Sequence, residues 1–179
     1  YSGFDTKVGE IVQGSCVSHE IDILATKNGT LHVIECKFHS DDGLKCNVKV
    51  PLYINSRYTD VKLPLESKKN KTFTTTKGWV VTNTRFSQDA LEYGKCAGLY
   101  LLSWDYPHGD GLKERIDRLR LYPITVSTLL SNREKHFLLE RDVVLCRELV
   151  KNGFLLDHLG VSNGRKQRIL KEMKSLCNL

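Results

Sequence analysis

Apolar and polar side chains alternate in two short neighbouring segments near the start of the chain. Segments 20–24 and 31–36 both follow this period of two, which is typical of strands that place one face in a core. Between them, Asn28 and Gly29 form the dipeptide that most favours a two-residue hairpin turn. The pattern therefore predicts an antiparallel hairpin with its turn at Asn28 and Gly29.

The predicted hairpin brings acidic side chains from its two strands together. Residues paired in a hairpin lie equally far from the turn, so a turn centred between Asn28 and Gly29 pairs Asp22 with Glu35. Residues two apart share a face of a strand, so Lys37 joins both carboxylates on that face. The apolar neighbours can then enter the core, and these are Ile21, Ile23, Val33 or Ile34.

Two carboxylates and a lysine on one face make a candidate site for phosphodiester hydrolysis. Asp22 and Glu35 repel each other unless a cation lies between them, and a hard divalent ion such as Mg²⁺ prefers oxygen ligands. The backbone carbonyl of Cys36 offers a further oxygen ligand, and Lys37 can position water and stabilise charge on a phosphate. A surface hairpin with an ordinary Glu/Lys pair is the alternative explanation.

The motif resembles that of the PD-(D/E)xK nuclease superfamily, and within it that of the Mrr-like restriction endonucleases. Asp22, Glu35 and Lys37 match the pattern D-x(n)-E-x-K, and the resemblance spans residues 6–119. The superfamily order of helix, strand, helix and short strand is matched by segments 50–61, 78–84, 87–98 and 99–104. Many Mrr relatives carry Gln where this chain has Glu35, which is the commoner residue in the superfamily.

The resemblance implies an α/β restriction endonuclease-like core, with a mixed sheet flanked by helices. It also implies a Mg²⁺-dependent DNA endonuclease of the restriction or DNA-repair type, with Mn²⁺ as a substitute ion. Asp22 and Glu35 would bind the metal, and Lys37 would position the attacking water. Two alternatives stay open: a catalytically silent nuclease fold that binds DNA or is regulated by a nucleotide, and a purely structural domain.

Several residues around the motif have both a local and a functional interpretation. His19 and Glu20 lie beside Asp22 and are accessory candidates for substrate or metal contact, or simply exposed groups at a strand end. Arg57 is a candidate DNA contact, although an intrahelical pair with Asp60 is the favoured explanation.

A second group of candidates precedes the helix expected from Ser87. Thr84 and Arg85 follow a predicted strand, where short hydroxyls and basic side chains often face phosphate. Capping of the helix explains the polar residues here equally well, since Ser87 is a good N-cap and Asp89 complements the helix dipole.

The hydrophobic period changes from two to that of a helix near Leu112, and Pro123 then interrupts the chain. We therefore expect a nuclease domain over residues 1–122 and an all-helical module over 123–179. Ser131 and Glu134 form a capping box for one helix of the module, and segment 143–151 predicts another.

The last part of the chain resembles a helix-hairpin-helix, a module that grips DNA phosphates. Arg165, Lys166 and Arg168 make its final helix basic and are candidate DNA contacts. The alternative is an amphipathic helix that packs Ile169 and Met173 on the nuclease domain.

Composition agrees with one main core and an anionic partner. The chain has 179 residues and a formal net charge of +6, which favours DNA without proving it. The part beyond residue 122 is expected to be too small for a second large core. The six cysteines lack a CxxC pair and are expected to be reduced thiols, with Cys36, Cys96 and Cys146 buried as small apolar residues.

No apolar stretch approaches the roughly 20 residues that span a bilayer, so we expect no membrane partner and a cytoplasmic location. The chain starts at Tyr1, and members of the superfamily usually carry a helix before this point. We therefore expect a missing upstream segment, which the resemblance implies to be an ATP-cone-like module. A homodimer is left open.

Overall fold

The computed structural model describes residues 1–41, 43–68 and 72–178, which divide into two compact units. The first unit comprises Tyr1–Lys113 and the second Glu114–Leu179. Pro123, where the sequence analysis sets its boundary, lies in the second unit and forms an isolated antiparallel bridge with Leu145.

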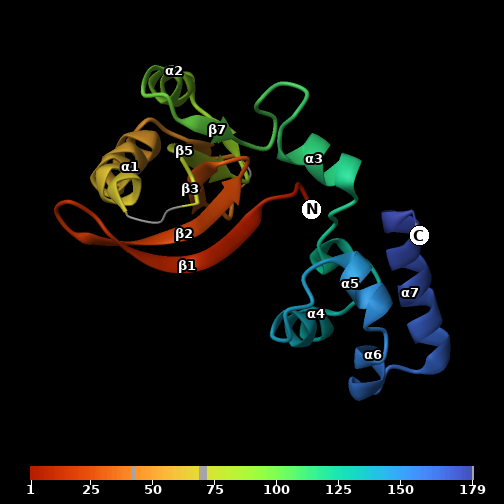
Figure 1. Cartoon of the computed structure of the whole chain (residues 1–179). Helices are drawn as coiled ribbons and strands as arrows, with labels where there is room; N and C mark the ends of the chain where they lie inside the picture. Colours follow the sequence, from red (N-terminus) through yellow and green to blue (C-terminus); the bar gives the residue numbers. More distant parts are fainter. Residues whose placement is uncertain (42, 69–71, 179) are drawn as a thin grey trace. The chain divides into compact units, whose positions relative to one another are not determined.

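The first unit contains a mixed five-stranded sheet with the order β1-β2-β3-β5-β7. The first three strands are antiparallel neighbours, and β5 and β7 continue the sheet in parallel with β3. Figure 1 shows β1 and β2 as a long curved pair of strands. The strands are β1 (Asp5–Gln13), β2 (Ser18–Lys27), β3 (Thr30–Lys37), β5 (Thr75–Thr82) and β7 (Tyr100–Leu102).

The hairpin between β2 and β3 has the turn and the register that the sequence predicts. Asn28 and Gly29 have φ angles of 50° and 72°, the left-handed conformation that a type I′ turn requires at both positions. The two strands pair from Lys27 with Thr30 to Ile23 with Ile34. Asp22 and Glu35 each lie one residue beyond the last pair of this register.

Two helices connect the parallel strands, as the chain order predicts. The helix α1 (Lys49–Ser67) lies between β3 and β5, and α2 (Gln88–Cys96) lies between β5 and β7. The Ser87 side chain accepts a hydrogen bond from the Ala90 amide, which confirms it as the cap of α2. Two short strands, β4 (Lys45–Cys46) and β6 (Arg85–Phe86), pair as a separate small sheet.

The lysine-rich segment 62–78 lacks a helical or strand period until Thr72 and so predicts a loop, but the structure is helical at its start and a strand at its end. Helix α1 continues to Ser67, and β5 already begins at Thr75. Helix α1 buries Val61 and Leu65 in its last turns, and this apolar burial outweighs the polar composition around them. Residues 69–71 of the predicted loop lie outside the described part of the chain.

Glu35 and Lys37 of the predicted site lie on the face of β3 that also forms the core. Leu31 and Val33 are buried with Val61 of α1, and Glu35 and Lys37 follow at spacings of two on the same face. Ile21 and Val33 enter the core, whereas Ile23 and Ile34 stay partly exposed. Glu35 and Lys37 therefore continue the row of core residues that faces α1.

The second unit is all helical. The helix α3 (Leu112–Leu119) has the bounds that Leu112, Ile116 and Leu119 predict, and it begins in the last residues of the first unit. The Ser131–Glu134 capping box is present at α4 (Asn132–Leu139). The remaining elements are the 3₁₀ turn η1 (Ile124–Val126) and the helices α5 (Cys146–Lys151), α6 (Leu155–His158) and α7 (Asn163–Cys177).

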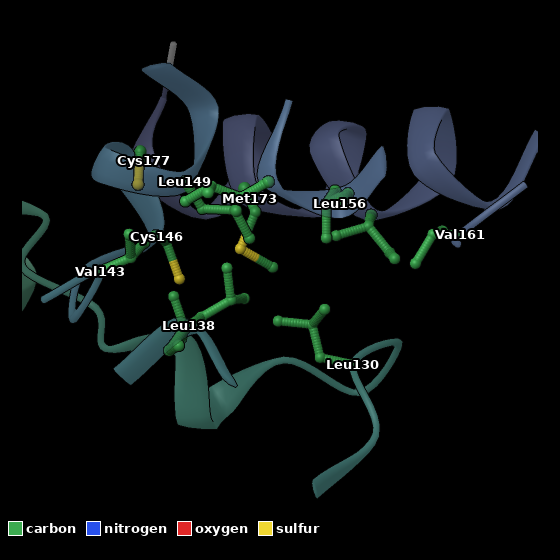
Figure 2. Packing of buried hydrophobic residues seen from close by; sticks show 12 residues of the cluster. Leu130, Leu138, Val143, Cys146, Leu149, Leu156, Val161, Met173 and Cys177 are labelled. Atoms are coloured by element: carbon green, nitrogen blue, oxygen red, sulfur yellow. The ribbon is translucent and has the colours of Figure 1, made fainter. Parts of the chain in front are cut away.

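The second unit has a hydrophobic core of its own, which Figure 2 shows at close range. Ile169 and Met173 of α7 are fully buried there with Leu138, Leu149 and Leu156. The expectation that the apolar face of the last helix packs on the first unit is therefore wrong, as is the expectation that this part is too small for a substantial core. Short helices joined by tight turns bury most of their apolar side chains against one another.

The cysteine positions differ in part from expectation. Cys146 is buried, but Cys36 and Cys96 are exposed, because an apolar sequence neighbourhood does not fix the direction of a side chain. All six cysteines are free thiols. Within the described residues, no helix is both long enough and apolar enough to cross a membrane.

Candidate metal-dependent active site

Asp22, Glu35 and Lys37 line one cavity of about 370 Å³. The register of the hairpin places Asp22 and Glu35 near each other. Lys37 is the last residue of β3, two residues beyond Glu35. The other wall comes from the first turns of α1, which contribute Lys49 and Tyr53. The structure thus brings the three residues of the D-x(n)-E-x-K pattern to one place.

Asp22 is oriented by the opposite strand. Its Oδ2 accepts a hydrogen bond of 2.7 Å from the amide of Cys36. The amide and the carbonyl of a strand residue point to the same edge of the strand, so the Cys36 carbonyl also faces the β2 side. Asp22 and this carbonyl therefore offer oxygen atoms on one side of β3.

Glu35 is half-buried beneath α1, and burial raises the pKa of its carboxyl above the ordinary value of 4.5. The guanidinium of Arg57 opposes this effect, while the charge of Asp22 adds to it. The net direction is upward. The two carboxylates therefore lie close enough to repel each other, in a place where one cation compensates them only in part.

Arg57 is the cation that contacts Glu35. Its Nη2 and Nε donate to Glu35 Oε1 at 3.0 and 3.3 Å, its Nη1 donates to the Tyr53 hydroxyl at 3.0 Å, and its Nη2 also donates to the carbonyl of Glu20. The predicted intrahelical pair with Asp60 is therefore wrong. The carboxylate of Asp60 is engaged by the β1–β2 turn, and Glu35 is the carboxylate that contacts Arg57.

Asp60 instead holds the turn between β1 and β2. Its carboxylate accepts from the amides of Cys16 and Val17 at 2.7 and 3.2 Å, and His19 Nε2 lies 2.7 Å from its Oδ2. The bond with His19 is the main reason that the pKa of Asp60 falls to about 2. His19, an accessory candidate, is thereby a partner of Asp60 that also lies within electrostatic reach of Glu35.

The other accessory candidate, Glu20, is an exposed residue. Its backbone carbonyl, and not its carboxylate, accepts the hydrogen bond from Arg57. The side chain is absent from the lining of the Asp22–Glu35 cavity.

Sequence reasoning missed Lys49, a second lysine of the cavity. The available signal was its spacing, since Lys49, Tyr53 and Arg57 follow one another at intervals of four and so share a face of α1. The predicted helix begins at Val50, whereas α1 begins at Lys49, so the prediction excludes this lysine by one residue.

Thr84 and Arg85 lie at a different cavity, of about 420 Å³, with Asn83 and Trp104. Thr84 is buried at 3% exposure, with its hydroxyl 3.4 Å from that of Thr82. Arg85 Nε donates to Asp105 Oδ2 at 2.8 Å on the surface. Thr84 and Arg85 therefore line a different cavity from Asp22 and Glu35. The Thr84 hydroxyl is buried, and the Arg85 guanidinium is paired with Asp105.

Two of the three basic candidates on α7 are engaged within the second unit. Arg165 forms an ion pair with both oxygens of Glu134 and donates to the carbonyl of Leu129, and Lys166 contacts Asp157 at 2.6 Å. Arg165 is the main cause of the pKa of Glu134 falling to about 2. Arg165 therefore has a structural role, because its partner is the buried acid of a capping box, and its contact with DNA stays a prediction. Arg168 is exposed.

The chemistry of the cavity fits a hard divalent cation. Asp22 and Glu35 supply carboxylate oxygens, and Cys36 lines the same cavity. The pKa of Glu35 is raised by burial first and by the charge of Asp22 second, and a bound cation would oppose both effects. Throughout residues 1–41, 43–68 and 72–178, no cluster of three His, Cys, Asp or Glu side chains is arranged around a common point. A metal here would thus combine two side chains with backbone and water oxygens.

Comparison with known proteins identifies relatives over nearly the whole chain. An uncharacterized protein of Archaeoglobus fulgidus is 34% identical over 175 residues, which cover 97% of this chain and 94% of that protein. The crystal structure of AF1548, a protein of unknown function, matches with a TM-score of 0.77 and 32% identity over 98% of this chain and 90% of that one. The family model "AF1548-like, C-terminal" matches residues 122–177.

Proposed function

We propose a function from the site itself, because the chain belongs to the AF1548-like family and its matched members carry no stated activity. The proposed function is that of a divalent-metal-dependent DNA endonuclease with a restriction endonuclease-like core. The single observation that carries this proposal is the common cavity of Asp22, Glu35 and Lys37. Those residue types match the D-x(n)-E-x-K pattern, and the mixed sheet with α1 and α2 between its parallel strands is compatible with the fold.

Each residue of the cavity has a separate task in this proposal. Asp22, Glu35 and the carbonyl of Cys36 would hold Mg²⁺ or Mn²⁺. When bound, such an ion lowers the pKa of water and compensates charge on the phosphate. Lys37 carries an ammonium group at the same cavity, where it can hold the attacking water and stabilise charge that develops on phosphate oxygens.

Arg57 supports the proposal as a positioning residue. It donates only to Oε1 among the oxygens of Glu35, and its bonds to Tyr53 and Glu20 fix its own direction. Glu35 is therefore held in one orientation and favoured in its ionised form, which is the form that binds a metal.

The second unit supplies a candidate DNA contact. Helix α6, a turn with Gly160 at φ 69°, and helix α7 follow one another in the order helix, turn, helix that the helix-hairpin-helix interpretation requires. Its exposed basic residues are Arg168, Lys171 and Lys174 of α7. We place the phosphate contacts at these three side chains instead of at Arg165 and Lys166.

The decisive experiment is cleavage of supercoiled plasmid by the full chain in Mg²⁺ or Mn²⁺, with EDTA as the control. Cleavage that requires the metal and disappears in Glu35→Ala supports the proposal. Equal cleavage by wild type and variant would show that a different site, or a contaminant, is responsible.

A DNA-binding domain without catalysis is the second candidate function. The observation in its favour is the Arg57–Glu35 pair, because a guanidinium already compensates part of the charge that a metal would compensate. Salt-dependent DNA binding without cleavage in any divalent metal would select this candidate.

A further inference from the structure

A second cavity, of about 730 Å³, is wider and largely open to solvent, and it lies between the β1–β2 turn and α1. Its walls include Cys16, Val17 and His19 on one side and Leu63 on the other. Tyr53 lines both this cavity and the one that holds Asp22 and Glu35. The two cavities are therefore neighbours that share an aromatic side chain.

Tyr53 is an exposed ring that is nevertheless fixed in direction. The residue is 61% exposed, its hydroxyl accepts a hydrogen bond of 3.0 Å from Arg57, and the guanidinium carbon of Arg57 lies 5.4 Å from the ring centroid. Arg57 is itself held by Glu35 and by the carbonyl of Glu20. A ring held in this way can stack on a flat ligand with little further loss of conformational freedom.

The charges of the second cavity disfavour a phosphate and favour an uncharged ring. Its acidic group is Asp60, which lines the cavity with His19 as its partner, and the guanidinium of Arg57 is already paired with Glu35. The apolar side chains of Val17 and Leu63 on its lining are 57% and 66% exposed. A flat heterocycle with an apolar face and polar edges matches this combination.

We propose that this second cavity receives an unpaired nucleobase, stacked on Tyr53, from the strand whose phosphodiester bond lies at Asp22 and Glu35. The inference rests on the proposed nuclease function, and it names the substrate class of that site: DNA with a single-stranded or unstacked nucleotide beside the cleaved bond. A base inside a regular duplex is stacked between its neighbours and cannot reach Tyr53 without leaving the helix.

The test is a binding experiment without cleavage. A fluorescent thymidine oligomer and an abasic oligomer of the same length are titrated with the full chain in EDTA. Since stacking on one aromatic side chain contributes enough for about a ten-fold change in affinity, wild type should bind the thymidine oligomer about ten-fold more tightly. Tyr53→Ala should lose this preference while keeping its affinity for the abasic strand.

Two control variants separate stacking from indirect effects. Tyr53→Phe keeps the ring and loses the hydroxyl contact with Arg57, so it should retain the preference. Phe154→Ala removes an aromatic residue of the second unit that is 54% exposed, and it should behave as wild type. Thermal melts of each variant by circular dichroism establish that the comparison is between folded proteins.

The outcomes distinguish this inference from the proposed function. A Tyr53-dependent base preference in a protein that cleaves no DNA would support the base cavity and overturn the nuclease. Metal-dependent cleavage without any base preference would support the nuclease and overturn the base cavity. The inference is also overturned if neither oligomer binds, if Tyr53→Ala weakens both oligomers equally, or if Tyr53→Phe loses the preference as fully as Tyr53→Ala.

Discussion

Arg57 reaches across from α1 to Glu35 on β3, and its Nη2 lies 3.0 Å from the Oε1 of that carboxylate. The side chains of both residues are largely buried, at 19% and 12% exposure. This contact ties β3 to helix α1. Metal binding at Glu35 therefore depends on the protonation of Glu35 and on the position of Arg57.

The first prediction concerns catalysis. Glu35→Ala removes a metal ligand and Lys37→Ala removes the ammonium, so each should reduce the rate of DNA hydrolysis by about 10²-fold or more. Lys37→Ala should still bind Mg²⁺ or Mn²⁺ by calorimetry, whereas Glu35→Ala should bind it much more weakly. A plasmid assay in which both variants cleave at the wild-type rate would exclude this cavity as the active site.

The second prediction concerns pH. The pKa of Glu35 is raised above 4.5, and Arg57 acts to lower it. Metal binding requires the ionised carboxylate, so affinity should fall as the pH decreases through this raised pKa. Arg57→Gln should move that loss to higher pH, and Arg57→Lys should move it less. Calorimetric titrations at successive pH values from 4.5 upward measure the shift. An unchanged pH profile in Arg57→Gln would contradict a positioning role.

The third prediction concerns the anchoring of the β1–β2 turn. A Cβ atom at residue 14 would lie 2.2 Å from Asp60 Oδ2 and 2.6 Å from the carbonyl oxygen of Val17, so both contacts must be relieved by a shift of these groups or of residue 14. Gly14→Ala should therefore destabilise the fold by about 1 to 3 kcal/mol in denaturant unfolding. Gly164→Ala is the matched control, since a Cβ there meets no atom within 4 Å. Equal stability of the two variants would mean that the turn is not held against Asp60.

The fourth prediction concerns the second unit. Glu134→Gln weakens the capping box and the pair with Arg165, and at neutral pH it should cost about 2 kcal/mol of unfolding free energy. The folded-state pKa of Glu134 lies near 2, below its ordinary value of 4.5, so its ionised form stabilises the fold above pH 4.5. This contribution is lost as the pH falls from 4.5 toward 2. The difference between wild type and variant should shrink over that window, and a constant difference would contradict the assignment.

The fifth prediction concerns DNA contacts of α7. Arg168→Glu and Lys171→Glu change exposed side chains and should leave the melting temperature close to that of wild type. If they contact phosphates, each should weaken DNA binding and make the salt dependence shallower by about one unit of slope. Arg165→Ala should instead lower the melting temperature, because it leaves the buried Glu134 without its cation. Binding and slope unchanged in the first two variants would remove α7 from the interface.

The short-range features were predictable from the sequence because short-range rules decide them. The Asn28–Gly29 turn fixed the register of β2 and β3, and a register defined at a two-residue turn extends without further information to Asp22 and Glu35. Ser87 and Ser131 marked helix starts, since a cap needs only the amides of the next turn. The order helix, strand, helix and strand after the hairpin, which the resemblance implied, agrees with α1, β5, α2 and β7.

The tertiary structure decided which charged groups meet. Arg57 contacts Glu35, and Asp60 contacts the β1–β2 turn. The packing of α1 on the sheet sets the distances between these groups, and sequence spacing does not. Arg165 likewise finds Glu134 across a gap of thirty-one positions, in a core that the sequence had not indicated. Side-chain electrostatics depends on burial and on partners far along the chain, and both exist only after the helices have packed.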